Sequence, residues 1–458
     1  MAKTSTQFTC QACGAVAPRW VGRCTSCGTW SSLVEESAPG KASRKPGGAR
    51  ASAAVQAVSS IDADHAARIP TGIAELDRVL GGGVVLGGVT LVGGDPGVGK
   101  STLLMQALAG LARQGHRSLY ISGEESAGQT AARARRLGAV ADELLVLAEN
   151  DLEVIEQVLD EIKPVAVVVD SVQTMRAGSL ESSAGTVSQL REVTSRMVER
   201  SKKNRFATFL VGHVTKDGVL AGPKVLEHLV DTVLAFEGER GHAFRSLRTQ
   251  KNRFGSATEV GVFEMTEGGM LEVPNPSALF LAERPRGASG SAIAATNEGT
   301  RAMLVEVQAL VGSLAVGSAR RTANGVDSGR LAMILAVLER KAGLMLAGLD
   351  VFLNVAGGLR VEEPAIDLPI ALAIASSLRN QVVPFDTVTF GEVGLAGEVR
   401  GVGRADARLA EALAMGFRRA IVPVSALDRA SRPPRHGQQA LEIVGVRTLE
   451  EALAATFA

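Results

Sequence analysis

The chain has few aromatic side chains, no long apolar run and no excess of either charge. Aromatic residues make up 3% of its 458 residues, with a single tyrosine, so extensive stacking of nucleic acid bases on aromatic side chains is not expected. The longest apolar runs, such as 331–338, are far too short to span a bilayer. The N-terminal segment lacks the apolar core of a secretion signal. We therefore expect a cytoplasmic protein without a membrane partner.

The charge balance by itself does not indicate a polyanionic partner. Lys and Arg total 49 against 48 acidic residues, a net charge of +1, whereas a strongly basic chain would suggest nucleic acid binding. Any DNA-binding surface must therefore consist of locally clustered basic residues. At about 150 residues per domain, the length predicts two or three domains.

Composition divides the chain into segments. Apolar, strand-like runs alternate with helical stretches in the central part, which predicts a mainly parallel sheet covered by helices; the runs lie at 89–92, 118–121, 165–169, 208–211 and 232–236. A Pro- and Gly-containing break at 283–290 precedes a part with mixed helices and strands. The expected divisions are a cysteine-rich unit at 1–34, a flexible Ala/Ser/Gly-rich linker at 35–66, an α/β domain at 67–275 and an α+β domain at 276–458.

The cysteine-rich unit contains every cysteine of the chain. They form two Cys-x-x-Cys-Gly pairs ten residues apart: Cys10, Cys13, Cys24 and Cys27. Four thiolates in this arrangement suit the closed tetrahedral shell of structural Zn²⁺, and the glycines let backbone amides turn towards the sulfurs. Iron or two disulfides are the alternatives, although disulfides fit a reducing cytoplasm poorly.

The purpose of this unit has two interpretations. A metal could serve as a folding staple for a segment too short to bury a core. Alternatively, the unit could contact DNA or a protein partner through Arg19, Trp20, Arg23 and Trp30. The sequence supports both.

A phosphate-binding loop follows the first core strand. The strand 89–93 runs directly into Gly-Asp-Pro-Gly-Val-Gly-Lys-Ser-Thr, which opens a helix, and this context separates GxxxxGK[ST] from an ordinary glycine-rich turn. Backbone N–H groups and the helix N-terminus would bind the phosphates of ATP or ADP. Lys100 should bridge the β- and γ-phosphates and Ser101 should ligate Mg²⁺. The expected nucleotide-binding residues are Gly94, Asp95, Pro96, Gly97, Val98, Gly99, Lys100, Ser101 and Thr102.

Acidic residues at the ends of two further strands could bind magnesium and activate water for ATP hydrolysis. Asp170 follows the apolar run 165–169 and is expected to hold Mg²⁺ through water, the alternative being a helix cap. Glu124 and Glu125 follow another strand. One of the two acids should polarise the attacking water, and we expect it to be Glu124 rather than Glu125; the other would then begin a helix.

This arrangement resembles the RecA family of recombinases and hexameric helicase motors. The resemblance implies that His213, at the end of a strand, senses the γ-phosphate; a lone histidine would otherwise pack or lie at the surface. Over essentially the whole chain, four features resemble the RadA, or Sms, family of bacterial DNA repair proteins: the four cysteines, Gly-Glu-Glu-Ser at 123–126, Ala-Gly-Pro-Lys-Val-Leu-Glu-His at 221–228 and Lys-Asn-Arg-Phe-Gly at 251–255.

The resemblance implies an α/β fold: a RecA-like P-loop ATPase core with a parallel sheet, a small zinc ribbon before it and a Lon-protease-like domain after it. It also implies a nucleoid-associated homohexameric ring, a DNA helicase or translocase that acts on single-stranded and branched DNA alongside RecA. Its function would be branch migration and processing of intermediates in recombination and repair. A non-motor switch, similar to circadian-clock ATPases, is the alternative for the same core.

Basic residues have implied roles in such a ring. Lys251 and Arg253 are two residues apart, so on an extended segment both would point towards the next subunit's ATP; the alternative is a solvated basic turn. Arg176, Lys216 and Lys224 lie in loops that would follow DNA phosphates in the channel. The run 196–205 is interpreted as a solvated helix end.

Residues 291–458 resemble the proteolytic domain of Lon, notably at 361–370 and 391–403. Lon uses a serine activated by a lysine, but Pro369 and Asp406 occupy those places here. Ser376 and Ser377 lie nearby, yet no lysine follows Lys341. We expect a non-proteolytic scaffold rather than an ATP-dependent protease. Its basic residues could line a surface for duplex arms or be ordinary solvated positions: Arg330, Arg340, Lys341, Arg400, Arg404 and Arg408.

Overall fold

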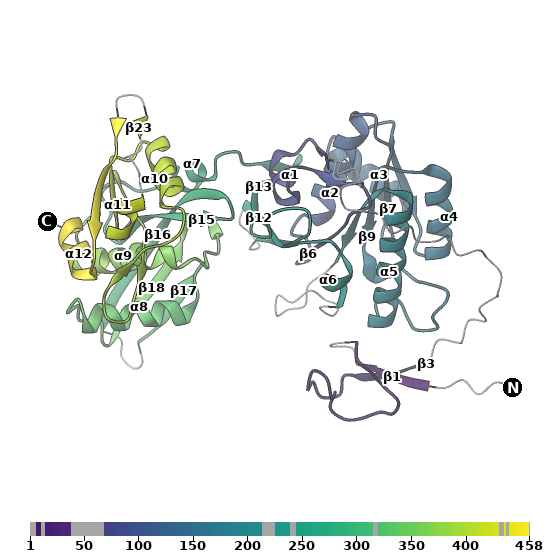
Figure 1. Ribbon diagram of the computed structural model, residues 1–458, viewed down its shortest axis with the longest axis horizontal. Helices are drawn as coiled ribbons and strands as arrows, with labels where there is room; N and C mark the ends of the chain where they lie inside the picture. Colours follow the sequence, from purple (N-terminus) through teal and green to yellow (C-terminus); the bar gives the residue numbers. More distant parts are fainter. Residues whose placement is uncertain are drawn as a thin grey trace, which may run out of the picture. The chain divides into compact units, whose positions relative to one another are not determined.

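The computed structural model describes eight stretches of the chain, namely residues 6–10, 14–37, 68–212, 225–238, 244–314, 319–429, 435–436 and 439–457. The chain forms two compact units: unit 1 comprises 1–237 and 245–272, and unit 2 comprises 238–244 and 273–458 (Figure 1). Within the described stretches, no helix combines the length and apolarity needed to cross a bilayer.

The N-terminal segment folds as a small antiparallel sheet in the order β2-β1-β3. Its strands are β1 (Thr6–Cys10), β2 (Val16–Ala17) and β3 (Leu33–Ser37). Among the described residues of this segment, the buried apolar cluster consists of Cys10, Cys24 and Leu33, with a few partly buried neighbours. So small a core cannot by itself offset the entropy of ordering the chain, so the fold needs a further crosslink.

The remainder of unit 1 is built on a nine-stranded sheet in the order β14-β13-β12-β11-β6-β10-β9-β7-β8. The pairs within β11-β6-β10-β9-β7-β8 are parallel. By contrast, β12 pairs antiparallel to β11, and β14 pairs antiparallel to β13. The strands are β6 (Val89–Gly94), β7 (Ser118–Ser122), β8 (Leu144–Ala148), β9 (Ala166–Asp170), β10 (Ala207–Val211), β11 (Thr232–Glu237), β12 (Phe244–Asn252), β13 (Val260–Thr266) and β14 (Gly269–Glu272). A short pair, β4 (Arg68–Ile69) with β5 (Val84–Val85), lies outside it.

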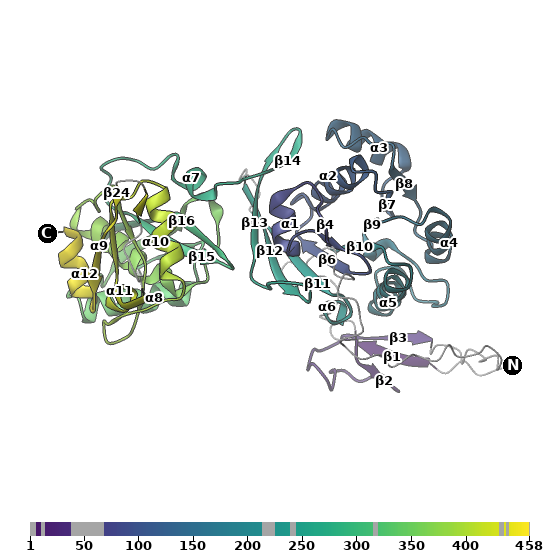
Figure 2. The same ribbon diagram turned by 45° about the horizontal axis from the view of Figure 1, so that its top comes forward.

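Helices cover both faces of this sheet (Figures 1 and 2). Successive strand residues point to opposite faces, so Val168 belongs to the core under α1–α3 and Val167 to the core under α4–α6. Burial on both sides explains the nearly continuous apolar runs of β6 and β9. The helices are α1 (Ala74–Leu80), α2 (Lys100–Arg113), α3 (Ala127–Arg136), α4 (Leu152–Ile162), η3 (Val172–Thr174), α5 (Val187–Asn204) and α6 (Val225–Leu229).

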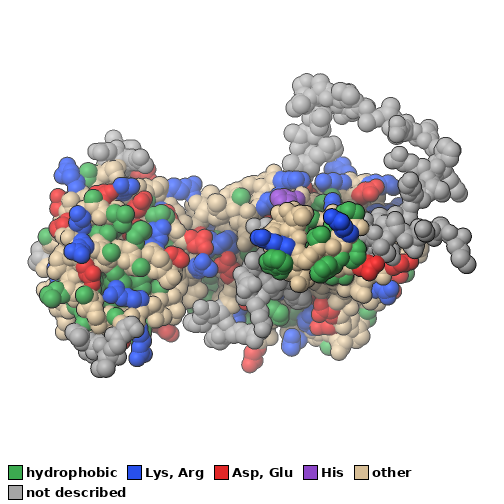
Figure 3. Space-filling view, turned by 90° about the horizontal axis from the view of Figure 1, so that it is seen from below, with side chains coloured by type: hydrophobic (Ala, Val, Ile, Leu, Met, Phe, Trp, Pro, Cys, Tyr) green, Lys and Arg blue, Asp and Glu red, His purple; other side chains and the backbone are tan. Residues whose placement is uncertain are grey.

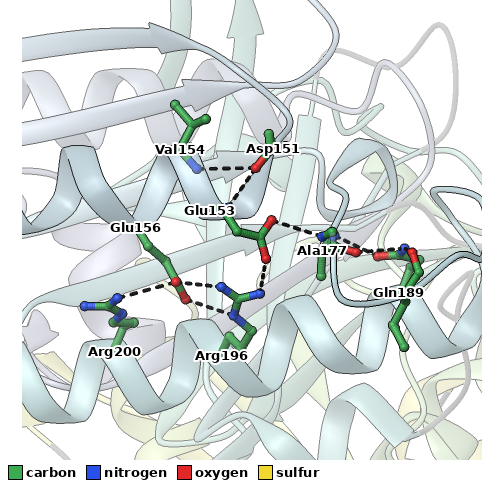
Figure 4. A network of polar contacts seen from close by, with 10 residues as sticks. Asp151, Glu153, Val154, Glu156, Ala177, Gln189, Arg196 and Arg200 are labelled. Carbon is green, nitrogen blue, oxygen red and sulfur yellow. Dashed lines mark hydrogen bonds and ion pairs between the residues drawn. The ribbon is translucent and has the colours of Figure 1, made fainter. Parts of the chain in front are cut away.

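An ion-pair network joins α4 to α5 (Figure 4). Arg196 binds Glu153 at 2.5 Å and Glu156 at 2.6 Å, and Arg200 binds Asp160 at 2.8 Å. The interpretation of the whole run 196–205 as a solvated helix end is therefore wrong for its first part. Those two arginines face a neighbouring helix, whereas Glu199 and residues 202–205 are exposed.

Unit 2 contains a seven-stranded mixed sheet in the order β17-β18-β16-β15-β19-β22-β25. Its strands are β15 (Ser291–Glu298), β16 (Arg301–Leu314), β17 (Arg321–Asn324), β18 (Leu349–Val355), β19 (Thr387–Thr389), β22 (Arg419–Pro423) and β25 (Glu442–Val446), with the short pairs β20 (Glu392–Val393) with β21 (Val399–Arg400) and β23 (Arg435–His436) with β24 (Gln439–Ala440). Its helices are α7 (Pro276–Leu281), α8 (Ser328–Arg340), η4 (Ala356–Gly358), η5 (Pro364–Ile366), α9 (Asp367–Arg379), α10 (Ala405–Ala414), α11 (Val424–Arg429) and α12 (Leu449–Phe457). The expected α/β fold class is confirmed.

One buried cation of unit 2 corrects an expectation from the sequence. Arg408 is 0% exposed. It donates to Glu363 Oε2 at 3.0 Å and to the Ala295 carbonyl at 2.6 Å. Arg408 is therefore neither a solvated residue nor one that could face duplex DNA. Its position in the amphipathic sequence of α10 did not show that it lies on the buried side.

Candidate nucleotide-binding site

The phosphate loop joins β6 to α2 through a backbone that requires glycine. Gly94, Gly97 and Gly99 have φ values of 152°, 82° and 115°, which side chains with a Cβ rarely adopt. A Cβ on Gly94 would lie 2.6 Å from the Phe236 carbonyl oxygen, and one on Gly99 would lie 2.7 Å from the end of the Met265 side chain. The loop is therefore a cradle of backbone amides, of the kind that fits phosphate groups.

Lys100 is buried at the start of α2, with its ammonium group inside the loop. The ammonium donates to the carbonyls of Gly94 at 2.6 Å and Asp95 at 3.0 Å. Burial lowers the pKa of Lys100, while the carboxylates of Asp170, Asp95 and Glu124 oppose that shift. The loop carbonyls thus satisfy this buried cation.

The hydroxyl of a tyrosine lies close to both residues expected to hold magnesium. Asp170 is the last residue of β9, and its Oδ2 accepts a hydrogen bond from the hydroxyl of Tyr120 on β7. The Ser101 side chain lies near the same hydroxyl. Burial, and then the Asp170 charge, raise the pKa of Tyr120 well above its usual value, so the hydroxyl keeps its proton. The hydroxyl and carboxylate oxygens of Ser101 and Asp170 are the ligand types that Mg²⁺ prefers.

The two adjacent acids after β7 face different partners. Glu124 Oε1 accepts a hydrogen bond from Ser171 Oγ at 2.6 Å, and Glu124 is among the carboxylates that act on Lys100. Glu125 instead pairs with Arg133 on α3 at 3.1 Å. The turn is fixed by Ser126, which forms a capping box with Gln129. Of the two acids, Glu124 is thus the one that acts on Lys100 of the phosphate loop.

Lys251 and Arg253 lie at the end of the sheet opposite to their own phosphate loop. Lys251 is opposite Val233, which pairs with Leu91, three residues before Gly94 or about 10 Å along the strand. Lys251 Nζ donates to the carbonyls of Glu227 at 2.5 Å and Val230 at 2.7 Å.

Arg253 lies beyond the end of β12, at Asn252, and pairs with Asp231 at 3.1 Å. Both cations therefore contact the segment that connects α6 to β11. Lys251 belongs to β12, whereas Arg253 follows the end of that strand.

Several expected residues lie outside the described stretches: Cys13, His213, Lys216 and Lys224. His213 follows β10, which lies between β6 and β9 in the sheet. The other expected DNA contact, Arg176, is described and exposed.

The loop that carries Arg176 is held by a side chain that sequence reasoning missed. Gln189 on α5 is 1% exposed and accepts from the Ala177 N–H at 2.8 Å (Figure 4). It also donates to the Ser182 carbonyl at 2.8 Å. The Arg176 N–H donates to the Asn150 carbonyl at 2.8 Å. The loop therefore presents Arg176 from an ordered backbone, and no local sequence pattern identified Gln189.

Basic side chains do not form one continuous field on the face shown in Figure 3, where Lys and Arg are interspersed with Asp and Glu. This agrees with the net charge of +1. Attraction to a polyanion would therefore depend on local clusters rather than on a single extended positive surface.

The structure brings three of the four cysteines together. The sulfur atoms of Cys10, Cys24 and Cys27 lie within 4.8 Å of one another, and Cys10 Sγ is 3.7 Å from Cys27 Sγ. Tetrahedral zinc with Zn–S bonds of about 2.3 Å places its sulfurs about 3.8 Å apart, whereas a disulfide needs about 2.05 Å. Gly14 and Gly28 close matching turns, at φ 72° and 76°. These residues fit a thiolate-bound metal.

The tryptophans expected to contact a partner are exposed beside this cluster. Trp20 and Trp30 are 57% and 70% exposed. Arg23 lies 5.8 Å from the Trp30 ring centroid and donates to the Gly28 carbonyl. An exposed surface of this kind is compatible with DNA or with protein.

The Lon-like positions in unit 2 lie in different environments. Pro369 is buried in the first turn of α9, and Asp406 is exposed on α10. Ser376 Oγ accepts from the Gly290 N–H at 2.8 Å and donates to the Gln381 carbonyl, and Ser377 Oγ accepts from the Val311 N–H at 3.0 Å. Both nearby serines bind backbone groups.

Three segments of the chain match known protein families. Residues 56–219 match the family described as "AAA domain", residues 8–35 match "Rubredoxin metal binding domain", and residues 332–426 match "Subunit ChlI of Mg-chelatase". The first match includes the phosphate loop and Asp170, the second includes all four cysteines, and the third includes both Lon-like segments.

Full-length relatives share one name. "DNA repair protein RadA" of Halalkalibacterium halodurans is 48% identical over 460 residues, covering 100% of both chains. The protein of the same name from Bacillus subtilis is 48% identical over 459 residues and 99% of each chain. That of Listeria monocytogenes is 47% identical over 453 residues, covering 99% of this chain and 98% of its own.

Proposed function

Because the chain belongs to the family of the DNA repair protein RadA, we propose that it is a DNA-dependent ATPase that works as a homohexameric ring on DNA. In this proposal it promotes branch migration and processing of recombination intermediates, and its partners are single-stranded and branched DNA and the RecA recombinase. The observation that carries the proposal is the convergence of Lys100, Asp170 and Glu124 on one phosphate cradle.

The residues of the cradle have separate roles in the proposed hydrolysis. The loop amides and Lys100 would bind the β- and γ-phosphates, and Ser101 and Asp170 would hold Mg²⁺. Magnesium bound there would supply positive charge to offset the charge that develops on the phosphates. Glu124, held by the Ser171 hydroxyl, orients the attacking water and accepts its proton. His213, after β10, would report the state of the γ-phosphate to the following loop.

Completion of the site by a neighbouring subunit is part of the proposal. Lys251 and Arg253 cannot reach their own phosphate loop, because they lie at the opposite end of the parallel strands. Their partners are carbonyl groups and Asp231, which a phosphate could replace. We infer that they stabilise charge on the γ-phosphate of the adjacent subunit's ATP.

Mixing of inactive subunits tests this sharing of the site. Arg253→Ala and Lys100→Ala homohexamers should both lack ATPase activity. If each interface acts independently, about a quarter of the interfaces in randomly mixed rings would join an intact phosphate loop to an intact Arg253, so activity should return to roughly that fraction. Mixed rings that stay inactive would contradict a contribution from the neighbouring subunit.

Stimulation by DNA is the expected signature of the motor. Arg176, Lys216 and Lys224 are proposed to contact DNA phosphates without reading sequence. Single-stranded DNA should therefore raise the ATPase rate, and the DNA concentration required should increase steeply with salt because counterions are released on binding. Steady-state hydrolysis with and without DNA measures this. A rate that ignores DNA would favour a non-motor switch instead.

The C-terminal part is proposed to be a non-proteolytic scaffold for ring assembly. Ser376 and Ser377 bind backbone groups, and no lysine follows Lys341 to activate a nucleophile. Casein should remain intact when incubated with the protein and ATP, while deletion of 291–458 should abolish hexamers in sedimentation. Casein cleavage would contradict the absence of protease activity, and an intact ring after the deletion would contradict the role in assembly.

Zn²⁺ is the proposed metal of the cysteine cluster, with Cys13 as its fourth ligand. The measured sulfur spacing fits tetrahedral thiolates. Elemental analysis of the purified chain distinguishes zinc from iron, and it should find one zinc per chain that Cys24→Ser removes.

A further inference from the structure

The single tyrosine of the chain occupies an unusual place beside the proposed magnesium ligands. Tyr120 lies in the middle of β7 and is 0% exposed. Its hydroxyl donates to Oδ2 of Asp170, and the Ser101 side chain lies nearby. One buried hydroxyl therefore binds Asp170 and lies near Ser101, the two residues that are proposed to hold the metal, although it belongs to neither the phosphate loop nor β9.

Arg133 fixes that hydroxyl from α3. Its side chain is 16% exposed, and its Nη2 donates to the Tyr120 hydroxyl oxygen at 2.9 Å. The guanidinium also lies over the tyrosine ring at 5.5 Å, binds Glu125 at 3.1 Å and approaches Asp170 Oδ2 to 3.8 Å. A planar, rigid group with this many partners is held in one orientation.

These contacts leave the two carboxylate oxygens of Asp170 in different states. Oδ2 is engaged by Tyr120 and faces Arg133. Oδ1 has no hydrogen-bond partner among the residues that the structure describes. Oxygens of metal-binding carboxylates are commonly divided in this way, one held by an outer partner and one directed to the metal or its water.

We propose that Tyr120 and Arg133 are positioning residues of the magnesium site, which hold Asp170 so that Oδ1 meets the hydrated metal. The inference rests on the proposed function, because it requires a magnesium nucleotide at the phosphate loop. Arg133 acts through Tyr120, and its pairing with Glu125 keeps that acid away from the site. Phenylalanine lacks only the hydroxyl of Tyr120 and keeps its ring. Tyr120→Phe therefore tests the hydroxyl separately from the packing of the ring, which belongs to the core under α1–α3.

Magnesium-dependent nucleotide binding tests the proposal without relying on turnover. A fluorescent ADP analogue is titrated into the full-length protein, first in EDTA and then over a range of Mg²⁺ concentrations. Tyr120→Phe should leave binding in EDTA unchanged but raise the Mg²⁺ concentration at half effect by about tenfold or more, the usual cost of losing an outer partner of a metal ligand. Arg133→Met should shift it in the same direction.

Arg135→Met is the matched control, because Arg135 is an exposed arginine on the same helix. An unchanged magnesium requirement in Tyr120→Phe would overturn the proposal. Tighter magnesium binding in Arg133→Met would overturn the role of Arg133, since it would show that the guanidinium only repels the metal.

A spectroscopic measurement gives an independent outcome. Because the chain has one tyrosine, incorporation of 3-fluorotyrosine produces a single ¹⁹F resonance from position 120. This resonance should move as Mg²⁺ is added to the ADP complex, and Arg133→Met should shift it before any metal is added. If ADP binds but the resonance ignores magnesium, this inference fails while the proposed function stands. If the wild-type protein binds no nucleotide, the proposed function itself fails.

Discussion

Lys100→Ala is expected to abolish ATP hydrolysis, with a fall in kcat of at least about a thousandfold, the scale on which a cation at the transferred phosphate contributes. Lys100 is 4% exposed and its ammonium lies within the phosphate loop. In the proposed mechanism it is the only lysine of the loop that meets the terminal phosphates. Steady-state ATPase assays with and without single-stranded DNA would measure the loss.

The same substitution should not damage the fold. Among the residues that the structure describes, the Lys100 ammonium binds loop carbonyls alone, and its lowered pKa reflects the cost of burying a cation. Without nucleotide, the variant should therefore melt at or above the wild-type temperature. ATP should raise the melting temperature of the wild-type protein by linkage but not that of the variant. Lys203→Ala, at the exposed end of α5, is the control that should keep full activity. A Lys100→Ala protein that hydrolyses ATP at a tenth of the normal rate would refute this assignment.

Arg408→Met is expected to destabilise unit 2 by about 3–5 kcal/mol, the range for breaking a buried ion pair from one side. Arg408 is 0% exposed, and its guanidinium is the cation for Glu363 and a donor to the carbonyls of Ala295 and Gly403. Methionine replaces much of the volume but leaves those acceptors without a donor. For a unit of this size, the melting temperature should fall by about 10 °C.

Differential scanning calorimetry of the full chain would measure the change. Arg400→Met is the matched control, because Arg400 pairs with Glu398 at the surface with its own side chain 59% exposed, and such pairs contribute about 1 kcal/mol or less. Adding Glu363→Gln to Arg408→Met should restore part of the stability, since it removes the uncompensated charge. Equal melting of Arg408→Met and Arg400→Met would show that the buried pair does not stabilise the unit.

Local sequence was sufficient for the features whose chemistry depends on neighbouring residues. The phosphate loop needs glycines and a lysine at fixed spacing between a strand and a helix, and a cysteine cluster needs two short pairs. Both are visible without knowledge of the fold. The family, which was expected from a resemblance over the whole chain, and the fold class are confirmed. Asp170 and Glu124 could be chosen as candidates for metal binding and water activation because the carboxyl ends of parallel strands lie together at one end of a sheet.

The long-range partners of those residues could not be predicted. Glu124 and Glu125 are adjacent and chemically equivalent in the sequence, and only the position of α3, which supplies Arg133 to Glu125, separates them. Arg408 lies in an ordinary amphipathic stretch, and its partner Glu363 is 45 residues earlier in the chain.

The sequence by itself determined that this protein has a phosphate-binding loop, a thiolate cluster and a parallel α/β core, because each follows from residue types at short, fixed spacing. Only the tertiary structure decided which charged groups share an environment. Tyr120 and Asp170 are 50 residues apart in sequence and lie on neighbouring strands, β7 and β9. Hydrogen bonds and ion pairs act over a few ångströms, so their partners depend on strand order and helix packing, and neither is written in the local pattern of residues.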